Sequence, residues 1–371
     1  MAKAITYASA GVSRGTREKS RLEITALLHN LSTAYGAGSP RILPFGVIFP
    51  EDKSLSRFID FQIEGVGTKT LIAEHAGKYD TIGIDAVAMA VNDVIRSGAK
   101  PVLLSDALHI SRSNLGRIRA ILRGVMQAAR VSGCTLASGE TGDVADILHR
   151  PIDPDETPFD LFVSALGIVE KEKIVRGQVS SGDLVIGLES SGIHSNGLSL
   201  ARRLLVKRWG GLYDIDDSPG ELGGKRTVGE ELLEPTRIYV APIIDVQRKY
   251  TIKAAIHITG DGFSKFGRLL SFQKSKGLGF EFDSLGEAPA VFRMIESAAK
   301  KLGKRISKKE MFRTFNMGYG FAVIVSAQDE DGVVDLLNRH CHARIIGKVA
   351  SSRQPKIVLE NVSHDGKTIL L

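Results

Sequence analysis

A glycine turn followed by a lysine is the first stretch of this chain whose residue types and spacing suggest chemistry. The segment EGVGTK places an acid, two glycines, a threonine and a lysine in close succession: Glu64, Gly65, Gly67, Thr68 and Lys69. Glycines let the backbone approach a ligand closely, and the lysine suits an anion such as a phosphate. The spacing fits neither the Walker loop nor the dinucleotide fingerprint. Taken alone, a tight turn with a solvated lysine is the commoner explanation.

Acidic residues follow on a predicted helix and on the strand after it. Asp85 is a candidate N-cap of the helix, and Asn92 lies seven residues later, on nearly the same face. Asp93 projects about a quarter-turn away, and Asp106 ends the strand. Several carboxylates beside a phosphate-seeking lysine favour magnesium bound to a nucleotide. A cap and a surface Asn-Asp pair explain the helix residues about equally well.

Two loops carry further polar groups. The sequence SGETGD puts Glu140 and Asp143 after a short apolar run, where a plain polar turn is also a sufficient explanation. The sequence ESSGIHSNG delivers hydroxyl, imidazole and amide groups to the start of a predicted helix: Ser191, His194, Ser195 and Asn196. Free N–H groups and the helix dipole favour an anion there, so this loop predicts a phosphate site. An N-cap and a packed loop histidine are the alternatives.

The composition is that of a globular protein. The chain has 371 residues, 43% of them hydrophobic and 25% charged, which is long enough for two domains. The net charge of +7 is scattered, aromatic residues are only 6%, and no nucleic-acid motif is present. We therefore expect no nucleic-acid partner. No run is long and apolar enough for a membrane span or a signal peptide. Cys134 and Cys341 have no metal or redox spacing, which predicts a reduced, cytoplasmic protein.

The predicted elements mix hairpin-like strands with crossover helices, which favours two α+β domains. We place the first at residues 1–170 and the second at 171–371, because hydrophobic patterning lapses between two strands there. Predicted helices span residues 16–32, 85–98, 115–133 and 329–340. Predicted strands include residues 54–65, 81–84, 100–106, 160–171 and 320–326.

Taken together and in order, the motifs resemble those of the aminoimidazole ribonucleotide synthetase (phosphoribosylformylglycinamidine cyclo-ligase) family. The segments that carry the resemblance are YASAGV, EGVGTK, DTIGIDAVAMAVNDVIRSGAKP, GCTLASGET, GLESSGIHSNGLSLARRLL, LLEPTRIYVAP, HITGDG and MFRTFNMGYG. They cover nearly the whole chain. The PTRIYV and FRTFNMG segments favour the cyclo-ligase branch over its relatives.

The resemblance implies a two-domain α+β subunit whose N-terminal sheets pair into a barrel-like homodimer core, with ATP near that interface. It implies that ATP phosphorylates the formyl oxygen of formylglycinamidine ribonucleotide. An amidine nitrogen then closes the imidazole ring and releases phosphate, so the protein mainly positions reactants and neutralises charge. The expected cofactors are ATP and Mg²⁺.

The resemblance also assigns roles to residues. It implies that Lys69, on a mobile glycine loop, contacts ATP phosphate and acts in catalysis with His194 and Glu140. The nucleotide-binding residues it implies are Gly65, Gly67, Thr68, Lys69, Asp85, Asn92, Asp93 and Asp106. Those for the substrate are Ser191, His194, Ser195, Asn196, Thr236 and Arg237. The implied magnesium ligands are Glu64, Asp93, Asp106 and Glu140.

Three departures from the family pattern leave other readings open. Glu64 stands where the family has aspartate, SGET replaces GGET, and Asp261 interrupts a glycine triplet. One alternative is another ATP-dependent enzyme of the same superfamily, although the expected cysteines of its selenophosphate and hydrogenase-maturation branches are missing. The other is a non-catalytic paralogue that binds nucleotide, which the altered acid at Glu64 keeps open.

Overall fold

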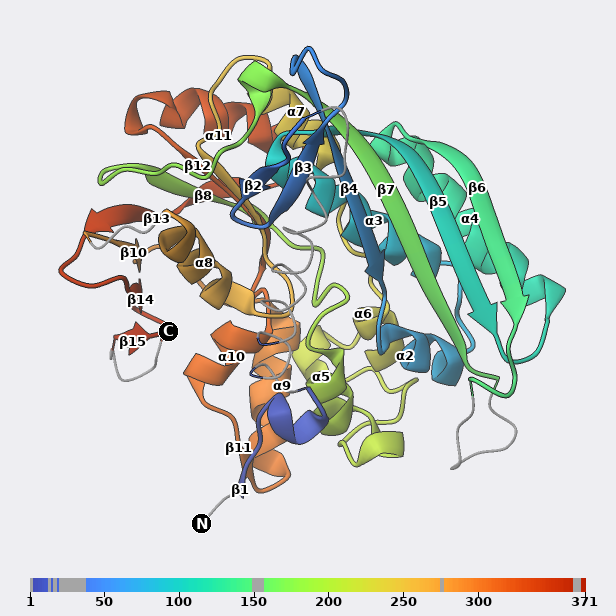
Figure 1. Ribbon diagram of the computed structural model, residues 1–371. Helices are drawn as coiled ribbons and strands as arrows, with labels where there is room; N and C mark the ends of the chain where they lie inside the picture. The colour runs from blue at the N-terminus through green and yellow to red at the C-terminus, as the bar shows by residue number, and fades with distance from the viewer. Residues whose placement is uncertain are drawn as a thin grey trace.

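The computed structural model describes residues 3–12, 15, 19, 38–148, 157–273, 277–362 and 368–371. The helix predicted over residues 16–32 lies, apart from Lys19, outside these ranges. The described chain forms two main sheets with helices against them, which confirms the predicted α+β class (Figure 1).

The first sheet has six strands in the order β2-β3-β4-β7-β5-β6. Its strands are β2 (Arg41–Leu43), β3 (Gly46–Pro50), β4 (Arg57–Gly65), β5 (Lys100–Ile110), β6 (Thr135–Asp143) and β7 (Phe159–Glu170). The helices of this half are α2 (Lys69–Ala76), α3 (Ile82–Val94) and α4 (Leu115–Ser132). Along β7 buried residues alternate with less buried ones, as expected when helices cover one face of a sheet only.

Helix α3 is buried almost all round because the sheet covers one side and the second half of the chain covers the other. It also approaches α4 closely: a Cβ on Gly83 would lie 2.2 Å from the carbonyl oxygen of Ile121. The predicted strand over residues 81–84 is wrong, because Thr81 is the N-cap and the helix begins at Ile82. Asp85 therefore lies inside the first turn and is not the cap.

The second sheet has seven strands in the order β15-β14-β10-β13-β8-β12-β9. They are β8 (Leu184–Glu189), β9 (Ala254–His257), β10 (Leu278–Phe282), β12 (Tyr319–Val325), β13 (Ala343–Ser351), β14 (Ile357–Leu359) and β15 (Ile369–Leu370). The helices of this half are α5 (Leu198–Leu205), α6 (Val228–Leu232), α7 (Val240–Gln247), α8 (Lys265–Phe272), α9 (Ala290–Lys301), α10 (Lys308–Thr314) and α11 (Glu330–Asn338).

The N-terminal segment joins the second half of the chain. Strand β1 (Lys3–Ala4) pairs in parallel with β11 (Lys304–Arg305). Arg203 donates a hydrogen bond to the carbonyl oxygen of Ser9 at 2.9 Å. The domain division at residue 170 stays a prediction. Residues 3–9 belong to the first predicted domain in sequence but contact residues of the second.

One face of the six-stranded sheet is open and apolar. Phe61 and Ile63 on β4 are 57% and 62% exposed, and Leu103 and Phe162 on the neighbouring strands are also exposed. In Figure 1 the helices α3 and α4 lie behind this sheet, and no helix lies in front of it.

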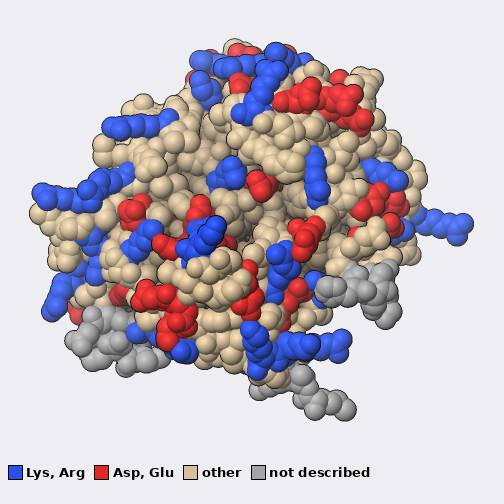
Figure 2. Space-filling view, turned by 180° about the vertical axis from the view of Figure 1, so that it is seen from behind, with Lys and Arg blue, Asp and Glu red and all other residues tan. Residues whose placement is uncertain are grey.

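The rest of the surface is mixed in charge. On the face shown in Figure 2, Lys and Arg side chains are interspersed with Asp and Glu, so the net positive charge forms no continuous basic area there. Of the helices in the described ranges, none combines the length and apolar character needed to cross a bilayer.

Candidate active site between the two sheets

Asp85 is the point at which three of the predicted site segments meet. Its buried Oδ1 accepts hydrogen bonds from Lys69 Nζ at 2.8 Å, Thr236 N at 2.8 Å and Ser195 Oγ at 3.1 Å. The Thr236 hydroxyl donates to the same oxygen at 2.6 Å, and Lys69 Nζ lies 2.7 Å from Oδ2. One carboxylate thus joins the glycine turn, the loop after β8 and the segment before α7.

Lys69 is less accessible than the sequence predicts. It is the first residue of α2, and its side chain is completely buried instead of projecting from an exposed loop. Nζ donates a further hydrogen bond to the carbonyl oxygen of Glu234 at 2.7 Å. Burial lowers the pKa of the Lys69 ammonium, and the carboxylate of Asp85 opposes that shift. Before it, the Thr68 hydroxyl contacts the Ser199 hydroxyl at 3.1 Å.

Asn92 holds the segment that follows Thr236. Its Nδ2 donates to the carbonyl oxygen of Arg237 at 2.8 Å, and its Oδ1 accepts from the Tyr239 N–H at 2.9 Å. Asp85 and Asn92 therefore contact one segment from one face of α3, which confirms the prediction from their spacing. The guanidinium of Arg237 lies 3.8 Å from Glu189 and remains partly exposed.

The loop between β8 and α5 buries its histidine. His194 has a left-handed backbone (φ 61°), and its Nε2 accepts a hydrogen bond from the Ser191 N–H at 3.2 Å. Burial lowers the pKa of His194 well below its usual range, so the ring is neutral. The Asn196 amide contacts Met89 Sδ at 3.8 Å. Gly197 is the N-cap of α5, so neither Ser195 nor Asn196 caps that helix.

A second polar cluster lies further along α3, around Asp93. Asp93 Oδ1 lies 2.7 Å from His257 Nδ1, and Oδ2 lies 2.7 Å from Arg96. Burial opposes the charge of Asp93, but Arg96 and His257 together hold its pKa below the usual range. Burial, and then the charge of Asp93, raise the pKa of Glu64 to about 8, so Glu64 keeps its proton at neutral pH and hydrogen bonds to Asp93.

The four predicted magnesium ligands do not come together. Glu64 and Asp106 pair with Val163 from opposite sides, so two strand spacings, roughly 10 Å, separate them. Asp93 is already bound by Arg96 and His257. Within the described ranges, no group of three His, Cys, Asp or Glu residues is arranged to hold a metal ion. The residues present thus do not fit a magnesium ion bound by these four acids.

Glu140 lies on a strand and not in the predicted loop. Strand β6 runs through the whole SGET segment, and Gly139 pairs with Asp106 of β5. Because side chains alternate along a strand, Glu140 points to the opposite, open face of the sheet, where it is exposed. Gly139 lies directly beside Asp106, since a Cβ there would be 2.7 Å from its Oδ1.

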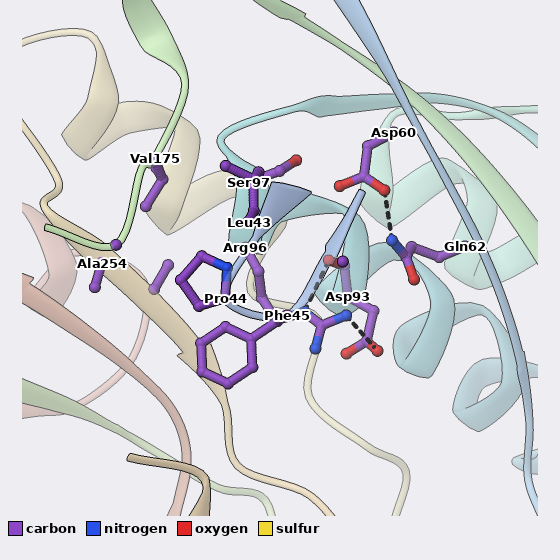
Figure 3. Close-up of a pocket in the computed structure, with 13 residues that line it drawn as sticks. Leu43, Pro44, Phe45, Asp60, Gln62, Asp93, Arg96, Ser97, Val175 and Ala254 are labelled. Carbon is purple, nitrogen blue, oxygen red and sulfur yellow. Dashed lines mark hydrogen bonds and ion pairs between the residues drawn. The ribbon is translucent and has the colours of Figure 1, made fainter. Parts of the chain in front are cut away.

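A cavity adjoins the Asp93 cluster (Figure 3). On one side Gln62 Nε2 donates to Asp60 Oδ1 at 2.5 Å, and Arg96 lies over the ring of Phe45. Val175 and Ala254 close the other side. Burial raises the pKa of Asp60 to about 6. Asp60, Gln62 and Arg96 are not among the residues that the sequence predicts for the site.

Their spacing carried a signal. Asp60, Gln62 and Glu64 alternate along β4 and therefore share one face, which the period of two could have revealed. Arg96 and His257 had no comparable pattern, because their partner Asp93 is distant in sequence from His257.

An open hollow borders the glycine turn. It is lined by Gly67, Thr68, Thr70 and Leu71 on one side and by Leu148, Pro158, Phe159 and other residues on the other. A Cβ at Gly67 would meet nothing within 4 Å, and its φ of 57° is one that glycine adopts without strain.

Family models and curated relatives agree on one family. Residues 50–169 match the model described as AIR synthase related protein, N-terminal domain, and residues 180–360 match the C-terminal domain model. The phosphoribosylformylglycinamidine cyclo-ligase of Pyrococcus furiosus is 36% identical over 96% of this chain and 98% of its own length. That of Methanobrevibacter smithii is 38% identical over 80% of this chain and 81% of its own.

Solved structures share the fold. E. coli HypE, a hydrogenase maturation protein, has a TM-score of 0.55 at 18% identity, covering 84% of this chain and 85% of that chain. T. maritima PurL complexed with ATP has a TM-score of 0.56 at 15% identity, covering 87% of this chain and 44% of the PurL chain. The motifs, the two-sheet fold and the matches over nearly the whole length lead to one conclusion: the chain belongs to the AIR synthase related family.

Proposed function

We propose that the protein catalyses the ATP-dependent cyclisation of formylglycinamidine ribonucleotide to aminoimidazole ribonucleotide, with release of ADP and phosphate, in purine biosynthesis. The observation that carries the proposal is the meeting of Lys69, Ser195 and Thr236 on Asp85. Segments 16 to 151 residues apart along the chain supply cationic and hydroxyl groups to one point. The relatives named cyclo-ligases support the assignment of the substrate.

Lys69 has to exchange partners during the reaction. In the present arrangement its ammonium is paired with the Asp85 carboxylate and donates a hydrogen bond to the carbonyl oxygen of Glu234. A phosphate of ATP would replace one anionic partner by another, so the charge of Lys69 would remain compensated in the buried site. Asp85 would then keep its hydrogen bonds from Ser195 and Thr236.

The hollow beside Gly67 is where we place the nucleotide. Backbone N–H groups at the start of α2 border it and suit phosphate, and Phe159 and Leu148 offer an apolar wall for a base. Because the four acids form no metal site, we propose that Mg²⁺ enters with ATP and is held mainly by its phosphate oxygens. We also propose a cytoplasmic location, as the family's metabolic role implies.

The open apolar face of the six-stranded sheet supports a homodimer. Exposed side chains such as Phe61, Ile63 and Phe162 cover it, and contiguous apolar surface of this kind marks an association site. A second copy of this chain presents the same face and is the partner that we propose. Glu140, which points to that face, would then lie at the interface and not among the other acids.

One assay tests the proposal. Purified protein is incubated with ATP, Mg²⁺ and formylglycinamidine ribonucleotide, and aminoimidazole ribonucleotide and ADP are measured in equal amounts. Production of both, at a rate that depends on protein concentration, supports the cyclo-ligase. Binding of ATP without formation of the imidazole product would contradict it.

A second candidate is a nucleotide-binding paralogue without cyclo-ligase activity. The completely buried Lys69–Asp85 pair and the separation of the predicted metal ligands favour this reading, because neither group is free to meet a ligand without rearrangement. If the protein instead catalyses another ATP-dependent reaction of the superfamily, the same assay would show no imidazole product.

A further inference from the structure

Among the described residues, two buried ones have backbones that non-glycine residues rarely adopt. His194 has φ 61° and Met317 has φ 51°, and both side chains are nearly inaccessible. The other non-glycine residues with positive φ in the described ranges, Leu55 and Asn361, are exposed. Such conformations are strained and persist only where the surroundings enforce them. The contacts that enforce the conformation of His194 therefore determine how this residue is presented.

Asn316 connects the two strained segments. Its Nδ2 donates to the carbonyl oxygen of Gly192 at 2.9 Å. Its Oδ1 accepts from the Ser190 hydroxyl at 3.1 Å and from the Gly318 N–H at 2.9 Å. The side chain is 3% exposed, so these bonds do not compete with bulk water. A backbone bond from Ser190 N to the Gly318 carbonyl, 2.8 Å, completes the junction.

Residues next to Asn316 in the sequence also pack against the loop 190–197. Gly197 has φ 79°, and a Cβ there would lie 2.4 Å from the ring of Phe315. A Cβ at Gly320 would lie 2.3 Å from Cε1 of His194. The residues from Phe315 to Gly320 therefore form a surface against which the loop 190–197 takes its shape.

The loop conformation decides where His194 presents a hydrogen-bond donor. Because Nε2 accepts from the Ser191 N–H and the ring is neutral, the proton is on Nδ1. This buried Nδ1 has no hydrogen-bond partner among the described residues. Buried donors are normally satisfied, so this N–H lacks a partner that a bound ligand could supply.

We propose that Asn316 is a positioning residue, whose amide fixes the loop 190–197 so that the Nδ1–H of His194 is aimed at the ribonucleotide substrate. The inference rests on the proposed function for the identity of the substrate. Asn316 does not touch substrate. It acts through the loop. Its loss affects the substrate's binding more than that of ATP, because Lys69 does not contact Asn316 and reaches the loop only through Asp85 and Ser195.

The first test is Asn316→Asp, which keeps Oδ1 and places an oxygen in front of the Gly192 carbonyl. We expect the KM for formylglycinamidine ribonucleotide to rise at least tenfold while the KM for ATP changes less than twofold. Asn338→Asp is the control. Asn338 ends α11, and its amide likewise bonds the backbone only: it donates to the carbonyls of Val334 and Ala343 and accepts from the Ala343 N–H. The Asn338→Asp substitution should leave both KM values unchanged.

Ser190→Ala is a milder second variant, which keeps the test valid if Asn316→Asp does not fold. It removes only one bond to Asn316, so we expect a rise of about threefold in the same KM, consistent with a single neutral hydrogen bond. Unchanged substrate KM in both variants would overturn the proposal. Equal rises in both KM values would also overturn it, because they would indicate a general loosening of the protein.

A measurement without substrate separates this inference from the proposed function. In protein labelled with ¹⁵N-histidine, the His194 signal is identified by its absence in His194→Gln. We expect the Nδ1–H tautomer in the unmodified protein and a loss of that preference in Asn316→Asp. An unaltered His194 signal in the variant would overturn the positioning role. A protein that makes no aminoimidazole ribonucleotide but shows the shift would refute only the proposed reaction.

Discussion

Asp93 on α3 and His257 on β9 are joined by a contact of 2.7 Å between Oδ1 and Nδ1, and both side chains are buried. The contact connects a helix of the first half of the chain to an edge strand of the seven-stranded sheet. Arg96 binds the other oxygen of the same carboxylate. A residue predicted from sequence to bind nucleotide and metal therefore also holds the two halves together.

Asp93→Asn should lower the stability of the protein strongly. The substitution leaves Arg96 as a buried cation without its partner, and breaking a buried pair in this way costs about 3–5 kcal/mol. Urea unfolding followed by circular dichroism measures the change. Asp245→Asn breaks the contacts of a partly exposed acid with Arg248 and His340 and should cost less than about 1 kcal/mol. Equal losses in the two variants would contradict the structural role of Asp93.

The contribution of Glu64 to stability should fall as the pH rises from about 5 to 8. The pKa of Glu64 is about 8 in the folded protein and near 4.5 when unfolded, so the folded state holds a proton that the unfolded state has released. The contribution is fully present below the unfolded value and is lost on passing the folded value. Its slope is at most about 1.4 kcal/mol per pH unit.

Glu64→Gln, which mimics the protonated acid, should flatten this part of the stability profile. Urea midpoints at half-unit pH steps provide the comparison. Glu287→Gln, at a largely exposed acid that pairs with Arg293, should leave the profile as it is. A variant at position 64 that retains the full slope would show that another group titrates there.

Lys69 can be tested as a phosphate ligand only if its structural role is compensated. Lys69→Ala would leave Asp85 buried without its cation, with an expected loss of about 3–5 kcal/mol. Lys69→Met combined with Asp85→Asn removes both charges and should recover most of that stability. We expect the double variant to remain folded and to lose turnover at least a hundredfold. Turnover close to that of the unmodified protein would exclude Lys69 from catalysis.

Binding of ATP should alter the fluorescence of Trp209, the single tryptophan of the chain. The centre of its ring lies 5.4 Å from that of His75, in the last turn of α2, so a displacement of this short helix would change the surroundings of the tryptophan. A titration with ATP should give a saturable change in emission in the unmodified protein. The same titration of the double variant at Lys69 and Asp85 should give none, and a matching response there would place the nucleotide elsewhere.

The proposed dimer should dissociate when its face is charged. Phe61→Glu with Ile63→Glu puts two carboxylates on the open sheet without touching its covered side. Light scattering after gel filtration should show twice the subunit mass for the unmodified protein and the subunit mass for the variant. Leu115→Glu, at a residue that is 62% exposed at the start of α4 on the covered side of the sheet, should remain dimeric. A monomeric unmodified protein would contradict the proposal.

Local patterns predicted much of the fold. The long amphipathic repeat of α4 presents one apolar face to the core, so its period appears in the sequence. Strand β4 also alternates, but its apolar Phe61 and Ile63 lie on the open face of the sheet. The strand predicted over residues 81–84 is wrong because α3 is buried on nearly all sides. The apolar start of this helix therefore resembles a short buried strand. The candidate site was predicted as a set of segments, and its internal pairing was not. Asp85 and Thr236 are 151 residues apart, and no local pattern indicates that they meet.

The pairing of β1 with β11 has a consequence for how the chain is made. Lys3 lies beside Lys304, so this two-stranded sheet closes a loop of about 300 residues. A ribosome must synthesise nearly the whole chain before the first strand finds its partner, and contacts so distant in sequence tend to slow folding. The N-terminal strand can therefore pair only after residues 304–305 have been synthesised, and a tag fused before it would lie beside the C-terminal half.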